Sequence, residues 1–391
     1  APVATGTSFE AAIKLYYEHA THLRPATKAD YTTATNTLLQ WAGKQGVEPD
    51  TLTRAKLIEY RAHLHALPKR RRMKGGSRGE QTEVAGRRSV TSVNGDLRVA
   101  RIVLGWLRST DRLPRVTLED LTIALKTYDE PDNPPEFLDP GELRELFNAA
   151  ARHDADVFEM TRDEKRTLGQ RRDSSKGSTP RHVPIAPLLL AATLSGMRLD
   201  ELCLLEWTTH MRLSALDFNG REVGEIRLRA QDTKTKKARA VSFDVSPLLR
   251  ELFVALHHAS GGRGSVFGVT YDAAQAAMER LKADYNAPTR FTYQMLRSTA
   301  STFLTNAPGI YGAASPFHSA KQLGHSVEVA QKHYTGVVKG ISPKLKTLEA
   351  VLQIQAEFEK RSLEQQRANE VGKRQSRADF YDSLTGATKD V

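Results

Sequence analysis

The sequence predicts a mainly α-helical protein with a small β-sheet, an α+β fold arranged in two domains. Its 391 residues exceed the usual size of one hydrophobic core. Apolar residues recur at three-to-four spacing along most of the chain, and at period two only around 225–243. Four prolines fall within one short segment, which favours an extended linker. The predicted parts are residues 1–127, a linker at 128–140, residues 141–340 and a C-terminal tail at 341–391.

The N-terminal part is predicted to be a small helical bundle. Apolar stripes with helical spacing begin at Phe9 and at Tyr31. Asp50 and Thr51 can cap a third helix, and a fourth runs from about Val90 to Trp106. Few strand signals interrupt this pattern, so we expect mainly helices.

A basic segment with several glycines, Pro68–Ser89, separates the third and fourth of these helices. It cannot bury a core, and we expect a loop. The loop is either a solvated linker or a segment that follows DNA phosphates. Because Lys+Arg 57 against Asp+Glu 46 gives a net charge of +11, the second interpretation is favoured. The candidate DNA-binding side chains are Lys69, Arg70, Arg71, Arg72, Lys74, Arg87 and Arg88.

The C-terminal part begins at a favourable helix start, where Asp139 can cap and Pro140 occupies the first turn. The polar stretch Thr161–Arg181 is typical of a surface insertion. Alternation at 225–243, on both sides of a polar tip, predicts a β-hairpin. Further helices are expected at 187–196, 247–258, 271–284, 295–305, 327–334 and, in the tail, 343–368.

Composition and motifs exclude several classes of protein. No run of about 18 apolar residues is present to span a bilayer. One cysteine, Cys203, cannot form an internal disulfide, and the N-terminus lacks the pattern of a signal peptide, which favours the cytoplasm. No His, Cys, Asp and Glu cluster has metal-site spacing, and no phosphate-binding glycine loop or serine-hydrolase elbow occurs. We therefore expect no metal, cofactor or membrane partner.

Five residues form a set suited to breaking and rejoining a DNA phosphodiester. Two arginines can hold phosphate oxygens in fork geometry. A tyrosine hydroxyl can attack phosphorus and become covalently attached. Each residue alone could be accidental, but their order and spacing together are not. The five are Arg198 in Ser-Gly-Met-Arg-Leu-Asp-Glu-Leu, Lys234 in Thr-Lys-Thr-Lys-Lys, Arg297 in Met-Leu-Arg-Ser-Thr, His325 in Leu-Gly-His-Ser, and Tyr334 nine residues later.

These motifs resemble those of the tyrosine recombinases of the phage integrase family. The resemblance covers about 137–340, where Phe137–Leu143 is similar to the start of the family's catalytic domain and Ser195–Trp207 to its first arginine box. The N-terminal bundle fits the family's core-binding domain by position and helix content. The resemblance implies a site-specific recombinase that cuts and rejoins DNA through a 3′-phosphotyrosine intermediate, without metal or ATP. It also implies integration or transposition of a mobile genetic element.

The resemblance gives each matching residue a role. Arg198 would bind the scissile phosphate, with Glu201 orienting its guanidinium from three residues further along a helix. Arg297 would be the second phosphate ligand, near a helix start. His325 would donate to the five-coordinate phosphate, and Tyr334 would be the nucleophile.

The general acid is expected on the tip of the predicted hairpin. Lys234 would protonate the departing 5′ oxygen, as the family's hairpin lysine does. Lys236 and Lys237 lie two and three residues away and are rivals for this role. They are also candidate DNA-binding side chains.

One position departs from the family's pattern. The family usually places histidine three residues before its second arginine, where this chain has Gln294. An amide can hydrogen bond but cannot take a proton near neutral pH. Tyr293 or a water could substitute, and His333 is a further candidate for handling the nucleophile's proton.

The expected partners are duplex DNA recombination sites and further copies of the chain, with four protomers on two duplexes in the family's arrangement. The apolar tail helix would pack on a neighbouring protomer or on its own chain. A bacterial cytoplasmic protein associated with the nucleoid would fit. Two alternatives stay open: a catalytically weak DNA-binding regulator or architectural protein of the same fold, which Gln294 favours, and an enzyme like type IB topoisomerase that relaxes supercoiled DNA.

Overall fold

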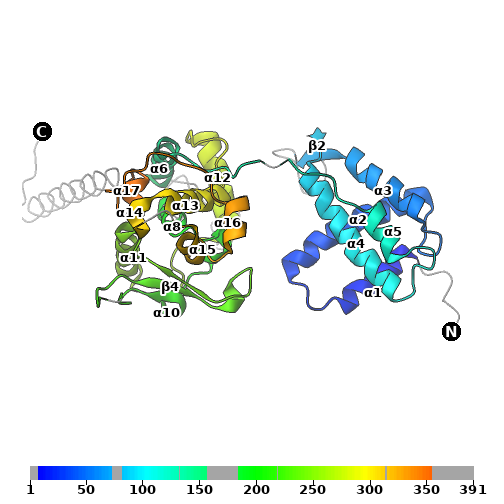
Figure 1. Ribbon diagram of the computed structural model, residues 1–391, viewed down its shortest axis with the longest axis horizontal. Helices are drawn as coiled ribbons and strands as arrows, with labels where there is room; N and C mark the ends of the chain where they lie inside the picture. Colours follow the sequence, from blue (N-terminus) through cyan, green and yellow to red (C-terminus); the bar gives the residue numbers. More distant parts are fainter. Residues whose placement is uncertain are drawn as a thin grey trace, which may run out of the picture. The chain divides into compact units, whose positions relative to one another are not determined.

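The computed structural model describes residues 8–72, 82–131, 133–155, 184–217, 219–312 and 315–354. The chain divides into two compact units, residues 1–132 and 133–391. In Figure 1 the N-terminal unit runs from blue to cyan and the C-terminal unit from green to orange. Each unit has a hydrophobic core of its own.

The N-terminal unit is a helical bundle, and the mainly helical prediction is confirmed. Serine or threonine hydroxyls cap four of the helices by accepting hydrogen bonds from first-turn amides. Thr53, rather than Asp50, caps the third helix. Buried Leu38, Tyr60 and Leu97 contribute to the shared core. The helices are α1 (Phe9–His19), α2 (Pro25–Gln45), α3 (Arg54–Ala66), α4 (Val90–Ser109) and α5 (Leu118–Ala124).

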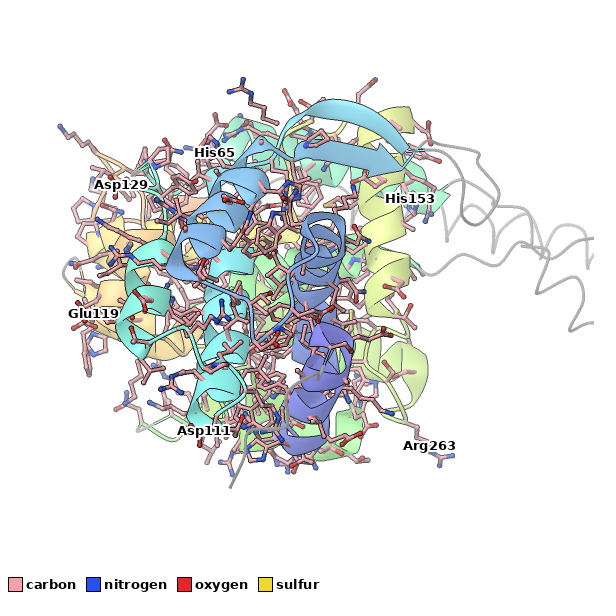
Figure 2. The ribbon with its side chains drawn as sticks, turned by 90° about the vertical axis from the view of Figure 1, so that its right-hand side faces the viewer. His65, Asp111, Glu119, Asp129, His153 and Arg263 are labelled. Carbon is pink, nitrogen blue, oxygen red and sulfur yellow. The ribbon has the colours of Figure 1, made fainter. Side chains whose placement is uncertain are left out.

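A two-stranded antiparallel ribbon joins α3 to α4, where we expected a loop. Strand β1 (Pro68–Arg72) pairs with β2 (Thr82–Arg87). The loop prediction was therefore wrong at the two ends of the segment 68–89, which form strands. Main-chain hydrogen bonds hold these strands together, and such bonds form without alternating apolar side chains. Lys74 lies outside the described residues. His65, next to the ribbon, and Asp111, just beyond α4, mark opposite ends of this unit in Figure 2.

Two buried helices form the centre of the C-terminal unit. Helix α8 (Ala186–Ser195) packs against α13 (Tyr293–Asn306), and other helices surround the pair (Figure 1). Residues 188–195 of α8 are buried on every side, as expected for a helix this apolar. The remaining helices are α6 (Pro140–Ala155), α9 (Leu199–Cys203), α10 (Trp207–His210), α11 (Pro247–Ser260), α12 (Tyr271–Asp284), α14 (Pro308–Tyr311), α15 (Pro316–Leu323), α16 (Val327–His333) and α17 (Leu348–Val351).

A small antiparallel sheet covers one side of this unit, with strand order β3-β4-β5. The predicted hairpin is present as β4 (Glu225–Leu228) and β5 (Arg239–Ser242), in which Ile226 pairs with Val241. A 3₁₀ turn, η1 (Ala230–Asp232), begins the tip. The short strand β3 (Met211–Arg212) was not predicted, because two residues are too few to show a period.

The segment between the units is anchored at both ends. Asn94 holds the main chain of Tyr128 through two hydrogen bonds, of 2.9 and 2.8 Å, within the N-terminal unit. The Leu138 amide donates to the Thr299 hydroxyl at 2.9 Å within the C-terminal unit. Proline-rich chain connects the two anchors.

The start of the tail packs on its own chain. Leu348, Val351, Leu352 and Ile354 are buried in the core of the C-terminal unit. The Leu348 amide donates to the Val245 carbonyl at 2.8 Å. The predicted tail helix is wrong for residues 343–347 and 352–354, which are not helical, and its part beyond residue 354 lies outside the described residues. The predicted insertion at 161–181 lies outside them as well.

Candidate active site

A glycine turn after α8 sets the position of Arg198. Gly196 has a φ of +61°, in the left-handed region, and a Cβ there would overlap the Leu323 side chain. The turn therefore lets the chain leave the buried helix and start α9 with Arg198 at its cap. The Arg198 side chain is 16% exposed.

Glu201 holds two arginines. Its side chain is fully buried and accepts from the Arg198 amide at 3.0 Å and from Arg198 Nη1 at 3.3 Å. It also accepts from Arg239 Nη2 at 2.6 Å, and Arg239 Nη1 donates to the Gln322 carbonyl at 2.9 Å. Sequence reasoning missed Arg239, although its place on the same hairpin as Lys234 was a usable signal.

Arg297 fastens the ends of two helices. Its Nη1 donates to the Gly196 carbonyl after α8, and its Nη2 to the Leu323 carbonyl at the end of α15, both at 2.7 Å. A cation is favourable at helix C-termini. Burial, and then the nearby charges of Arg198 and Arg239, lower the Arg297 pKa to about 10, so the group remains a cation at neutral pH.

Tyr334 covers Arg297 and stacks on His325. The Arg297 Cζ atom lies 5.0 Å from the centroid of the Tyr334 ring. The His325 and Tyr334 rings are 5.0 Å apart and nearly parallel, with an interplanar angle of 5°. The Tyr334 carbonyl accepts from Thr302 Oγ1 on α13 at 3.2 Å. The predicted nucleophile is thus placed beside the second arginine of its own chain.

His325 is a neutral imidazole in this setting. Burial, and then the charge of Arg297, lower its pKa to about 4. Both ring nitrogens are buried and have no hydrogen-bond partner among the described residues. Such a ring can still donate one hydrogen bond to a phosphate oxygen.

Hydrogen bonds of the neighbouring residues shape the hairpin tip that carries Lys234. The hydroxyl of buried Thr233 donates to the Lys237 carbonyl at 2.9 Å, which closes the tip. Asp232 accepts from Arg229 Nε at 2.8 Å, and this hydrogen bond is the main reason that its pKa falls to about 2. Lys236 has a φ of +54° in the turn. All three lysines of the tip are exposed.

One pocket of about 550 Å³ brings several predicted residues together. Arg198, Lys234, Gln294 and Tyr334 line it, coming from α9, the hairpin tip, α13 and the end of α16. The rival lysines of the tip and Arg297 do not line it. Asp200, which sequence reasoning did not single out, is also part of the wall.

Helix α12 forms another wall that the sequence did not reveal. Tyr271 and Gln275 line the pocket from this helix. Tyr293 also lines the pocket, and its hydroxyl donates to the Ala274 carbonyl at 2.9 Å. Burial raises the pKa of this phenol, so it stays a neutral hydroxyl at neutral pH, and a neutral hydroxyl is a very weak base.

The N-terminal unit has a basic hollow of about 340 Å³ where the ribbon meets α4. Lys69, Arg87 and Arg88 line it together with Ser89 and Ser92. Arg88 also forms an ion pair with Asp96 at 2.8 Å. The side chains of Arg70, Arg71 and Arg72 on β1 are not described.

The described residues contain no group of three or more His, Cys, Asp or Glu side chains arranged to hold a metal ion. No helix within the described ranges is long and apolar enough to cross a membrane.

Sequence comparison with protein-family models and with curated proteins gives no match. Solved structures do match. Lambda integrase (residues 75–356), in a dimer bound to a COC′ core site, has a TM-score of 0.53 and 10% identity, over 86% of this chain and 99% of that chain. The Tn1549 transposon integrase in complex with circular intermediate DNA has a TM-score of 0.48 and 14% identity, over 85% and 97%. XerA recombinase has a TM-score of 0.33 and 15% identity, over 85% and 94%.

At this sequence identity the likeness to lambda integrase is a likeness of fold. It extends across both units, since 86% of this chain is covered. The resemblance first drawn from the arginine, histidine and tyrosine motifs is therefore confirmed at the level of three-dimensional structure. The chain has the fold of the integrase-type tyrosine recombinases.

Proposed function

We propose that this protein is a site-specific DNA recombinase that cleaves and rejoins strands through a 3′-phosphotyrosine at Tyr334. The observation that carries the proposal is the pocket lined by Arg198, Lys234, Gln294 and Tyr334. Arg297 and His325 lie directly against the Tyr334 ring. The pocket supports the proposal because the residues proposed as phosphate ligand, proton donor and nucleophile all line it.

Arg198 faces the pocket and is the first ligand of the scissile phosphate. The Glu201 carboxylate fixes its guanidinium, so the fork is oriented before DNA arrives. Arg297 is covered by the Tyr334 ring and is 1% exposed. Movement of this ring toward the DNA would therefore uncover the second arginine as the nucleophile approaches phosphorus.

Lys234 is the proposed general acid, because it lines the pocket and Lys236 and Lys237 do not. It protonates the departing 5′ oxygen while the Tyr334 oxygen bonds to phosphorus. The phosphotyrosine conserves the energy of the broken ester. Rejoining then proceeds by attack of a 5′ hydroxyl, without ATP.

The proposed partners are duplex recombination sites and further copies of this chain. Three candidate residues for phosphate binding, Lys69, Arg87 and Arg88, meet at the hollow beside α4. Lambda integrase was solved as a dimer bound to a DNA core site, which supports DNA as substrate and more than one protomer on it. A tetramer in a bacterial cytoplasm, acting on a mobile element, completes the proposal.

Covalent trapping on a nicked duplex tests the proposal, after footprinting has mapped the bound sequence. After cleavage, the nick lets the short fragment that bears the 5′ hydroxyl diffuse away. Rejoining needs that hydroxyl, so the cleaved strand stays attached to the protein. We expect an adduct with the natural chain and none with Tyr334→Phe, which should keep its DNA affinity. Tight binding without adduct would instead identify a silent DNA-binding protein. Relaxation of supercoiled DNA by monomers, without sequence preference, would identify a topoisomerase.

A further inference from the structure

A tyrosine nucleophile needs a group that accepts its proton. Neutral hydroxyls are weak nucleophiles, and an adjacent base activates them. In this pocket Gln294 occupies the position where a histidine was expected, and an amide cannot serve. The function proposed above therefore leaves the base unassigned.

Imidazole side chains near Tyr334 are poorly placed for this role. The His325 ring is nearly parallel to the tyrosine ring, at 5°. Nitrogen lone pairs lie in the plane of the imidazole, so they cannot point at a hydroxyl in a parallel plane. His333 is exposed, its ring centroid is 6.5 Å from that of Tyr334, and it does not line the pocket.

The nearest buried carboxylate is already fully used. Glu201 Oε1 accepts from Arg198 Nη1, and Oε2 accepts from the Arg198 amide and from Arg239 Nη2. Proton uptake there would break the contacts that hold both guanidiniums. Glu201 therefore orients cations and does not accept the proton.

Asp200 differs from Glu201 in each of these respects. It is exposed, and it lines the same pocket as Tyr334 and Gln294. Its Oδ1 accepts from the Glu201 amide at 3.0 Å, and it forms no ion pair with another described residue. Of the described residues that line this pocket, Asp200 alone carries a carboxylate.

We propose that Asp200 is the catalytic base that takes the Tyr334 proton, in place of a histidine at position 294. An aspartate serves the same purpose in protein kinases, where it accepts the proton of an attacking hydroxyl. The inference rests on the proposed function, because it has meaning only if Tyr334 attacks DNA.

The step balances without a further reactant. The Tyr334 O–H bond breaks and its proton passes to a carboxylate oxygen of Asp200, while the tyrosine oxygen bonds to phosphorus. The bond from phosphorus to the 5′ oxygen breaks, and that oxygen receives a proton from the Lys234 ammonium. In the rejoining step a 5′ hydroxyl returns its proton to Lys234, and Asp200 returns the other proton to Tyr334.

The test compares Asp200→Asn, Asp200→Glu and Asp272→Asn on the nicked duplex. Asp272 is a matched control, because it is also an exposed aspartate in the first turn of a helix, α12, but does not line the pocket. A second duplex has sulfur in place of the 5′ bridging oxygen. A thiolate is a good leaving group that needs no proton. The sulfur duplex should therefore restore cleavage by a variant that lacks the general acid, but not by one that lacks the base.

We expect Asp200→Asn to slow adduct formation by about 10²–10⁴-fold with unchanged DNA affinity. Asp272→Asn should react normally, and Asp200→Glu at least about tenfold faster than the asparagine variant. The sulfur duplex should restore Lys234→Ala and fail to restore Asp200→Asn. A rate for Asp200→Asn within about threefold of the natural chain, or its rescue by sulfur, overturns the role of Asp200 alone. No adduct with the natural chain overturns the proposed function too.

Discussion

At the scale of single residues, three arginines gather around one buried carboxylate. Glu201 binds Arg198 and Arg239 directly, and Arg297 lies close enough for their charges to lower its pKa. Burial is the larger cause of that shift, and it lowers the pKa of Arg239 as well. Asp200 is a second carboxylate whose charge acts on Arg239, so three cations against two anions leave one excess positive charge, which a DNA phosphate would neutralise.

Removing the charge of Glu201 should cost considerable stability. Glu201→Gln leaves Arg198 and Arg239 near each other without their shared anion, in a setting where Arg239 is 9% exposed. Breaking a buried ion pair from one side costs about 3–5 kcal/mol. We expect urea unfolding to show a loss of about 3 kcal/mol in the free energy of unfolding.

The matched control for this experiment is Glu279→Gln. Glu279 is 67% exposed and pairs with Lys282 on α12 at 3.7 Å. Exposed pairs contribute about 0–1 kcal/mol, so this variant should unfold almost like the natural chain. Equal losses for the two variants would show that the Glu201 contacts do not stabilise the fold.

Local sequence motifs identify site residues that are close in sequence. They do not identify residues that reach the site from separate segments of the chain. Arg198 with Glu201, and His325 with Tyr334, are each close in sequence. Arg239 and Asp200 gain their significance only when β5 and α9 come together. A place on the same hairpin as Lys234 marks Arg239 as a candidate but does not predict its contact with Glu201.

At the scale of elements, the chain contains two hairpins of different kinds. The hairpin of β4 and β5 has alternating Ile226, Leu228 and Val241 that face the core, so its period predicted it. The ribbon of β1 and β2 has the sequence Pro-Lys-Arg-Arg-Arg in its first strand. Such a run shows no alternation of apolar and polar residues, which explains why a loop was expected there.

The start of the tail depends on a close approach to α14. A Cβ at Gly309 would overlap the carbonyl oxygens of Leu345 and Pro343. Gly309→Ala should therefore push residues 343–345 away from α14 and loosen the packing of Leu348. Backbone hydrogen exchange over residues 343–354 should then become faster. Gly43→Ala has open space around its Cβ and should leave this exchange unchanged. Slow exchange in both variants would show that the approach tolerates a methyl group.

At the scale of the whole molecule, the chain consists of two units that each have a core. Candidate phosphate-binding residues occur in both units. Lys69, Arg87 and Arg88 line a hollow in the first, and Arg198 and Lys234 line a pocket in the second. The net positive charge of the sequence indicated a polyanionic partner. Only the folded chain shows which of its lysines and arginines lie close together on the surface. Binding to DNA should therefore draw on both units.

The salt dependence of DNA binding measures the contribution of the first unit. Arg87→Ala removes one exposed cation from the hollow. If that cation binds a phosphate, the slope of log K against log salt concentration should become shallower by about 0.9. Lys56→Ala removes a cation that pairs with Glu59 at 2.7 Å, and its slope should stay unchanged. An unchanged slope for Arg87→Ala would exclude this hollow from the DNA interface.

The identity of the residue that bears the cleaved strand tests the proposed function most directly. After trapping on the nicked duplex, protease digestion and mass spectrometry of the peptide that contains residues 333–337 would locate the attached nucleotide. We expect a nucleotide joined through its 3′ phosphate to Tyr334 and to no other residue. A nucleotide on a different side chain, or a cleaved strand with no protein attached, would contradict it.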